Sequence, residues 1–394
     1  MILIKNLLGL ILLLTLVSCS KSKQDSLEGL PLDISFPSAY FTDPDKIASQ
    51  SASPVIMDKL IAMINASPAH SSIYLSIFGF DHSGVIASLK KASKRGVDLH
   101  LLVDNSIDET RLQNAKTIST IKGFLTDGSE LVIVDNDCTA SAINHNKFVL
   151  FSSLNTLEGL KHQVIFQTSH NFTIDDSKKI QDAVVVSDSG IYEAYFNYWQ
   201  DISKKAVSGM TNFYYREYQN ELTGISAYYF PKRRNGVSYG DDTIIEILNG
   251  ISKPSGAIIK VGMSDWTSSR LNIVNKLGDL LNAGAHIEVI AKNKADIEIL
   301  NGLEGLRKKG AYIKIYNIVN SNQQKVNIHA KFLMIKGEWK GKQCTVLATG
   351  SHNYTQNALR NNNETLLLFK NNTVLYNAYT IWYDALKKLP GSSE

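Results

Sequence analysis

The chain has 394 residues, of which 44% are hydrophobic and 20% are charged, and its formal net charge is +4. It is long enough for two domains with buried cores, and its composition is that of an ordinary soluble globular protein, which excludes the fibrous and low-complexity classes. The slightly basic balance permits an anionic partner, such as lipid head groups or nucleic acid, but does not require one.

Residues 1–19 have the pattern of a bacterial export signal. A lysine precedes an apolar run over residues 7–17, which is too short for an ordinary membrane-spanning helix. Residues 16–19, Leu-Val-Ser-Cys, resemble the lipobox of bacterial lipoproteins, whose cysteine is lipidated and becomes the new N-terminus. We therefore predict a lipoprotein signal peptide over residues 1–19, lipidation of Cys19 and a tether over residues 20–38, with a plain signal peptide or short anchor as the alternative. The protein would be exported and membrane-bound, at the outer membrane or cell surface, because in a Gram-negative cell Ser20 after the cysteine resembles a signal for outer-membrane sorting.

The predicted first half covers residues 39–210 and begins with alternating helices and strands. Ile56, Leu60 and Ile64 share one face of a predicted helix. An apolar strand follows over residues 73–80, then a second helix that ends at Gly96, and then a strand over residues 97–103. This alternation indicates a layered α/β domain.

The predicted second half, residues 211–394, repeats this order at a shift of 188 positions (244 − 56). A basic run over residues 232–234 opens it, and such a run is more typical of a solvated turn than of a ligand patch. Cys138 and Cys344 fall in different halves, so we expect two free buried thiols rather than a disulfide. The matched pairs are Ala39 and Ala227, Ile56 and Ile244, Ser76 and Ser264, and Gly96 and Gly284.

Each half also carries the same series of polar residues. The histidines are 184 positions apart (329 − 145), whereas the serines, the asparagines and the acids are each 182 apart (351 − 169, 353 − 171, 364 − 182). Two copies in one order indicate an internal repeat. The series is His145, Lys147, Ser169, Asn171 and Asp182 in the first half, and His329, Lys331, Ser351, Asn353 and Glu364 in the second.

These residue types suit chemistry on a phosphate group. Alternate residues of a strand share a face, so the members of each His-x-Lys pair and each Ser-x-Asn pair are expected to project together. Lysine supplies positive charge to a phosphate, and serine and asparagine supply hydrogen-bond donors. A neutral histidine can attack phosphorus, and a protonated one can protonate a leaving oxygen. Asp182 and Glu364 are the candidates for orienting the two imidazoles. His170 and His352 are expected to face away, either as packing residues or as residues that support the site from behind.

The sequence contains no His-x-x-x-His pair and no glycine-rich nucleotide loop, and its cysteines are far apart. We therefore expect the site to work without a metal ion or another cofactor.

The two polar series resemble the phospholipase D superfamily, whose signature is His-x-Lys-x4-Asp followed by Gly-Ser-x-Asn, twice per active site. The resemblance covers residues 39–386. It implies two α/β/α sandwich halves with mixed sheets, related by pseudo-twofold symmetry, and one shared active site at their interface. One histidine would form a covalent phosphohistidine while the other protonates the leaving alcohol and then activates water or another alcohol, without a metal. By family habit His145 is the nucleophile and His329 the general acid and base, although the repeat leaves the reverse assignment open.

The chain departs from that signature in both blocks. The signature aspartate is replaced by Ser152 in the first block and by Lys336 in the second. The glycine before serine is present as Gly350 but is replaced by Thr168 in the first block, which is therefore the weaker match.

The leading interpretation is a monomeric, lipid-anchored phosphodiesterase that hydrolyses a phospholipid head-group bond, with head-group transfer as a variant. A membrane-tethered nuclease that cuts DNA or RNA is the alternative, because a fold does not set the substrate. A third possibility is an inactive phosphate-binding surface lipoprotein. Both complete His-x-Lys pairs argue against it, since two such pairs would repel each other across the interface.

Overall fold

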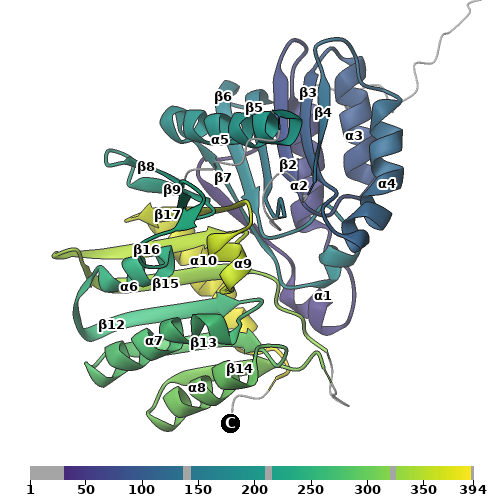
Figure 1. Ribbon diagram of the computed structural model, residues 1–394. Helices are drawn as coiled ribbons and strands as arrows, with labels where there is room; N and C mark the ends of the chain where they lie inside the picture. Colours follow the sequence, from purple (N-terminus) through teal and green to yellow (C-terminus); the bar gives the residue numbers. More distant parts are fainter. Residues whose placement is uncertain (1–30, 136–142, 209–214, 320–324, 392–394) are drawn as a thin grey trace, which may run out of the picture.

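Two similar halves, each built on a mixed β-sheet, make up the fold (Figure 1). The structure is a computed structural model that describes residues 31–135, 143–208, 215–319 and 325–391. The first sheet has the order β1-β7-β6-β5-β2-β3-β4, and the second has the order β14-β13-β12-β15-β16-β17-β9-β8. From β4 to β1 and from β14 to β9 the two sheets are equivalent, and β8 is an additional edge strand. The predicted pair of α/β halves with mixed sheets is therefore confirmed.

The elements of the first half are β1 (Ser38–Phe41), α1 (Pro44–Ala48), α2 (Val55–Ala66), β2 (Ser72–Ile77), α3 (Ser83–Lys94), β3 (Asp98–Asp104), α4 (Asp108–Lys122), β4 (Glu130–Val134), β5 (Lys147–Thr156), β6 (Gly159–Thr168), β7 (Asp182–Ser187) and α5 (Ser189–Ser208). Those of the second half are β8 (Arg216–Asn220), β9 (Ile225–Phe230), β10 (Arg233–Arg234), β11 (Val237–Ser238), α6 (Thr243–Asn249), β12 (Ile251–Met263), α7 (Leu271–Asn282), β13 (His286–Lys292), α8 (Ile297–Lys308), β14 (Tyr312–Tyr316), β15 (Lys331–Trp339), β16 (Lys342–Gly350), α9 (Gln356–Arg360), β17 (Glu364–Lys370) and α10 (Thr373–Leu386).

The halves stack as five layers with three buried cores. Helices α2, α3 and α4 cover the outer face of the first sheet, and α6, α7 and α8 cover the outer face of the second (Figure 1). Helices α5 and α10 contact strands of both sheets and form the layer between them. Strand β7 shows why the strands are apolar runs: Val184 and Val186 face the middle core, while Ala183 and Val185 face the outer one.

The shift between the halves is not constant along the chain. Ala39 pairs with Val184 and Ala227 with Leu367, which confirms the shift of 188 for the first strand of each half. However, Ile77 pairs with Lys147 and Met263 pairs with Lys331, so the shift is 186 at this strand (263 − 77). The expected match of Ser76 with Ser264 is therefore wrong, because two fewer residues precede the second-half strand. Ser264 occupies the position of Phe78.

The predicted helix stops are present in both halves. Ile56, Leu60 and Ile64 are buried on α2 as expected. Helix α3 ends at Lys94, and the chain then turns at Gly96, whose φ is +84°. Gly284, after α7, has a φ of +95°, so the same left-handed turn, which favours glycine, follows the equivalent helix.

The predicted tether over residues 20–38 ends earlier than expected. The backbone N–H of Leu32 donates to Asn155 O at 2.9 Å, and Ile34 is buried in the outer core of the first half. Apolar side chains at these positions attach the segment to the fold. Residues 1–30, with Cys19, and Cys138 lie outside the described residues, whereas Cys344 is a buried free thiol as expected. Within the described ranges, no helix is both long and apolar enough to cross a membrane.

Candidate active site

Each His-x-Lys segment is attached by backbone hydrogen bonds to the opposite half. The N–H of His145 donates to Asn363 O at 3.0 Å, and the N–H of His329 donates to Ile180 O at 2.9 Å. The histidines thus precede the strands, because β5 begins at Lys147 and β15 at Lys331. The expected strand alternation is not what aligns each pair. Instead each lysine folds back on its histidine.

Both lysine side chains are fully buried and donate to the carbonyl oxygen of the preceding histidine. The distances are 2.7 Å from Lys147 Nζ to His145 O and 2.5 Å from Lys331 Nζ to His329 O. Burial lowers the pKa of Lys147 to about 8, and nearby carboxylates, Glu364 first, oppose this change. Burial and then Lys147 lower the pKa of Lys331 to about 7. The two ammonium groups are therefore close enough to repel, which a bound anion would relieve.

His145 is oriented by a carboxyl group from the second half. Its Nδ1 lies 2.8 Å from Glu364 Oε1, and the other oxygen of Glu364 accepts a hydrogen bond from Ser351 Oγ at 2.5 Å. When Glu364 is ionised its Oε1 can only accept, so the ring proton then lies on Nδ1 and the Nε2 lone pair is free. The ring also makes an edge contact with Phe78, with ring centroids 5.0 Å apart.

His329 is oriented by uncharged oxygens from the first half. Its Nδ1 lies 3.1 Å from Gln181 Oε1, 3.2 Å from Ser169 O and 3.2 Å from Lys331 Nζ. We assign its proton to Nδ1 as well, because the two oxygens can only accept and Lys331 already donates to His329 O. The carboxylate of Asp176 is more distant, at 3.8 Å. Burial alone would raise the pKa of Asp176, but Lys179 holds it below its usual value. The negatively charged Asp176 carboxylate is therefore near the His329 ring but not within hydrogen-bond distance of it.

The prediction that Asp182 orients an imidazole is wrong. The N–H of Ser169 bonds Asp182 O and the N–H of Ser351 bonds Thr365 O, so Asp182 corresponds to Thr365, 183 positions away (365 − 182). Gln181 is therefore the counterpart of Glu364. The loop after Asn171 is one residue shorter than the loop after Asn353, and neighbouring residues at a strand end point to opposite sides.

Asp182 instead joins the two halves away from the histidines. Its Oδ2 accepts hydrogen bonds from Thr349 Oγ1 at 2.5 Å and from Tyr379 OH at 2.6 Å. Burial raises the pKa of its carboxyl group, and the hydroxyl donors, Ser169 and Thr349 among them, oppose that change. Its role is therefore to support the interface.

In each Ser-x-Asn pair the serine supports another side chain of the site, whereas the asparagine keeps a free amide donor. Ser169 Oγ donates to Gln181 Oε1 at 2.9 Å, as Ser351 Oγ does to Glu364, so the serine protons are used within the protein and not for a phosphate. The Oδ1 atoms of Asn171 and Asn353 accept from the N–H groups of Gly79 and Asp265, both at 3.3 Å. Their amide nitrogens have no partner among the described residues and can donate to a ligand.

Burial dominates the titration of the histidines and of Glu364. It lowers the pKa of both His145 and His329 well below the usual value, and the lysines, Lys147 and Lys331 respectively, add to the effect. It raises the pKa of Glu364 to about 8, against the opposing charge of Lys147. In the absence of an anion both rings are therefore neutral near pH 7. A bound phosphodiester would favour their protonated forms.

His170 and His352 are packing residues, as expected. Both are buried, and burial lowers their pKa to about 4 and about 3. His352 stacks on Phe230, with ring centroids 6.2 Å apart. Both rings therefore stay neutral and act as packing residues.

Three residues of the site, Gln181, Asp176 and Phe78, were absent from the predicted set. Gln181 could have been found, since it is adjacent to the predicted Asp182 and is a hydrogen-bonding residue like Glu364. Asp176 and Phe78 have no counterpart of the same type in the other half, so the repeat gave no signal for them. Among the described residues, no group of three or more His, Cys, Asp or Glu side chains is placed to hold a metal ion.

The fold has two equivalent halves, and each contributes a His-x-Lys segment to one candidate site that suits chemistry on a phosphate group. Comparison with known families agrees. Residues 60–203 and 251–384 match the family described as "Cardiolipin synthase, PLD-like domain". These ranges cover more than half of the chain, and the chain therefore belongs to the phospholipase D superfamily.

Curated relatives match only part of the chain. The phospholipases D of Rickettsia prowazekii (strain Madrid E) and Rickettsia bellii (strain RML369-C) are each 25% identical to it, over 146 and 142 residues. These alignments cover 37% and 36% of this chain and 61% and 60% of the relatives. The chain thus spans less than two thirds of the length of these relatives.

Two solved structures show the same fold over most of this chain. Phosphatidylserine synthase from Haemophilus influenzae Rd KW20 has a TM-score of 0.59 at 10% identity, covering 94% of this chain and 91% of that one. Polyphosphate kinase from Porphyromonas gingivalis has a TM-score of 0.55 at 13% identity, covering 89% of this chain and 50% of that one. At such identities the likeness concerns the fold alone.

Proposed function

We propose that the protein cleaves phosphodiester bonds through a covalent phosphohistidine at His145, with His329 as the general acid and base. The observation that carries this proposal is the unequal support of the two rings, by the Glu364 carboxyl group for His145 and by the Gln181 amide for His329. An imidazole that bonds to phosphorus becomes positively charged, and a carboxylate stabilises that charge where an amide does not. The asymmetry thus favours His145 as the nucleophile.

The proposed reaction has two steps. Nε2 of His145 attacks phosphorus, the bond from phosphorus to the leaving oxygen breaks, and protonated His329 gives its Nε2 proton to that oxygen. Neutral His329 then takes a proton from water, which attacks phosphorus and breaks the bond to His145. Lys147, Lys331 and the amide groups of Asn171 and Asn353 would hold the other phosphate oxygens in both steps.

We propose a phospholipid as the substrate, cleaved at its head-group bond. The matched family is described by a lipid-synthesising enzyme, and the curated relatives are named phospholipases D. A lipid anchor on Cys19 of an exported protein would keep the site at a membrane. Phe78 supplies an apolar surface beside His145, which suits a lipid better than it suits water. The family description also makes transfer to a second alcohol, in place of hydrolysis, a natural variant.

The test is to incubate the purified full-length protein, with EDTA present, separately with mixed phospholipid vesicles and with single-stranded DNA, using His329→Ala as the control. Release of a free head group by the wild type alone is the expected result. Cutting of DNA while lipids stay intact would replace the lipid proposal with a nuclease. Absence of both reactions would contradict the proposed function.

A further inference from the structure

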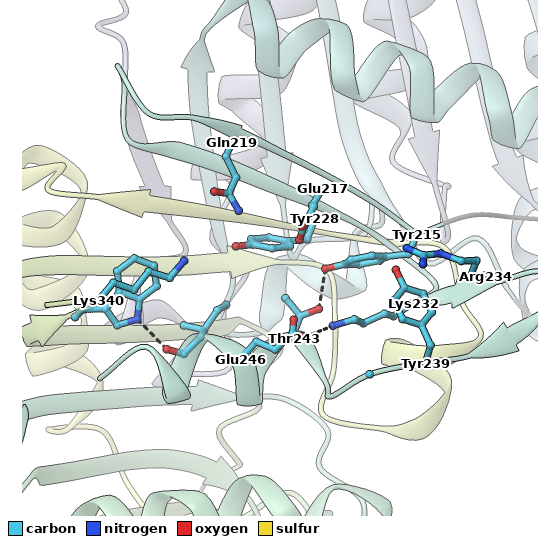
Figure 2. Close-up of a pocket in the computed structure, with 13 residues that line it drawn as sticks. Tyr215, Glu217, Gln219, Tyr228, Lys232, Arg234, Tyr239, Thr243, Glu246 and Lys340 are labelled. Atoms are coloured by element: carbon cyan, nitrogen blue, oxygen red, sulfur yellow. Dashed lines mark hydrogen bonds and ion pairs between the residues drawn. The ribbon is translucent and has the colours of Figure 1, made fainter. Parts of the chain in front are cut away.

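A groove in the second half shares no lining residue with the candidate active site. Its main pocket, of about 440 Å³, lies between the β8–β9 hairpin, the β10–β11 ribbon, α6 and the turn from β15 to β16 (Figure 2). A hollow of about 290 Å³ shares Tyr239 and Gly240 with it, and one of about 50 Å³ shares Tyr228 and Trp339. The three spaces adjoin, so together they suit an elongated ligand.

The groove is built where the second half departs from the repeat. Strand β8 and the β10–β11 ribbon have no equivalent in the first sheet. Helix α6 has 7 residues, whereas α2, which occupies the same place in the first half, has 12. The groove is therefore a feature of this half and not of the duplicated core.

Aromatic side chains form the walls and are fixed by polar contacts. Tyr215 OH lies 2.9 Å from Thr243 Oγ1, and Trp339 Nε1 donates to Ile247 O at 2.8 Å. Tyr215 and Tyr228 both line the pocket, on the side of it that lies above Thr243 in the view (Figure 2). Fixed rings lose little conformational entropy when a ligand packs on them.

The basic run over residues 232–234 contributes to this groove, and the expected solvated turn holds for the exposed Arg234 but not for the buried Lys232. Lys232 is 3% exposed, and its Nζ lies 2.5 Å from Glu246 Oε1 and 5.3 Å from the centre of the Tyr215 ring. Arg234 lies over the ring of Tyr239 at 4.6 Å. Half-buried aromatic rings attract both cations, so Lys232 packs inside the groove, while Arg234 stays exposed over Tyr239.

The groove presents free donors and free acceptors together. The Tyr228 side chain is 7% exposed, and its hydroxyl lines the pocket without a hydrogen-bond partner in the described part of the chain. Gln219 and Glu217 line the same pocket from β8, and Lys340 lies on the far side, 4.6 Å from the Trp339 ring. Solvent reaches this hydroxyl, and a ligand that forms a hydrogen bond with it would replace the solvent there.

We propose that this groove binds an oligosaccharide. A sugar offers hydroxyl groups that both donate and accept, and a C–H face that packs on aromatic rings. An apolar ligand would cover Tyr228 and Gln219 without hydrogen bonds to them. The lining carries charges of both signs, Glu217 and Glu246 with Lys232, Arg234 and Lys340, which suits a neutral polar ligand. The elongated shape suits a chain of sugar rings rather than a single one.

The test uses saturation-transfer NMR and titration calorimetry on the full chain with three tetrasaccharides, made of N-acetylglucosamine, β-linked glucose and α-linked glucose. We expect at least one to bind, and Tyr228→Phe, which removes only the hydroxyl group, to weaken its binding about tenfold, the value of one hydrogen bond. Tyr312→Phe, on β14 outside the groove, should leave binding unchanged. Both variants should retain the wild-type reaction with phosphodiesters.

Three results would overturn the proposal. They are the absence of binding by all three tetrasaccharides, equal affinity of wild type and Tyr228→Phe, and tighter, salt-sensitive binding of inorganic phosphate. The last result would assign the groove to an anion, because only a charged ligand is strongly screened by salt.

Discussion

Each histidine of the site is oriented by a residue from the opposite half. Glu364 of the second half holds His145, and Gln181 of the first half holds His329. A serine of the same half as the orienting residue, Ser351 or Ser169, fixes that residue in turn. Neither half alone therefore has an oriented imidazole, and the two rings differ in the side-chain group that orients them, a carboxyl group for His145 and an amide for His329.

Exchanging these two supports should have different effects. Glu364→Gln should lower kcat about 100-fold, within the range of acid–base contributions, because the positive charge formed on His145 loses its stabilising carboxylate. Gln181→Glu should raise the pKa of His329, because a new carboxylate favours the imidazolium. The loss of rate with rising pH, which reports deprotonation of the acid, should then occur at a higher pH.

The measurement is kcat against pH for a diester whose leaving group is an ordinary alcohol. Asp182→Asn is the matched control, since Asp182 is adjacent in sequence but bonds Thr349 and Tyr379 instead of the ring. The assignment of Gln181 as the residue that orients His329 would be disproved if Asp182→Asn also shifted the pH at which kcat falls. It would equally be disproved if Gln181→Glu did not shift that pH.

At the scale of elements, the two blocks accommodate the same backbone carbonyl in different ways. A Cβ on Gly350, at the end of β16, would lie 2.0 Å from Thr365 O on β17. At the equivalent place on β6, Thr168 Oγ1 donates to Asp182 O at 2.6 Å, and the threonine fits. The departure of the first block from the glycine signature is thus a local change in strand contact that leaves Ser169 and Asn171 in place.

Gly350→Ala should therefore destabilise the protein by about 1–3 kcal/mol, the usual cost of overpacking. The free energy of unfolding in urea is the measurement. Gly305→Ala on α8 is the control, because its Cβ would have no neighbour within 4 Å, and better helix propensity should stabilise the protein by up to about 1 kcal/mol. Equal effects of the two changes would show that the contact with Thr365 O carries no cost.

The sequence was informative wherever the repeat kept its spacing. The apolar periodicity of α2 and the glycines after α3 and α7 predicted real elements, and the His-x-Lys pairs predicted the centre of the site. The match between the halves was wrong at Asp182 and at Ser264, where the preceding segments of the two halves differ in length by one or two residues. Matching by residue type cannot detect such a shift of register. The extra strand β8 and the burial of Lys232 depend on tertiary packing and had no local signal.

At the scale of the whole molecule, two equivalent hydrogen-bonded triads cross the interface. In one, Asp182 accepts from Thr349 and Tyr379, and in the other Gln167 Oε1 accepts from Thr365 Oγ1 at 2.7 Å and Tyr195 OH at 3.0 Å. Each triad joins residues of both sheets and one helix of the middle layer. Together with the middle core they fix the two histidines relative to each other, which a two-step reaction at one phosphorus atom requires.

The central claim is that His145 carries the phosphoryl group and His329 completes the cycle. The most direct measurement is mass spectrometry of His329→Ala after incubation with a p-nitrophenyl phosphodiester of a lipid, whose leaving group needs no protonation. We predict a burst of about one equivalent of p-nitrophenol and an adduct on the peptide that contains His145, with neither in His145→Ala. An adduct on another residue, or no burst from His329→Ala while the wild type turns over, would contradict the account.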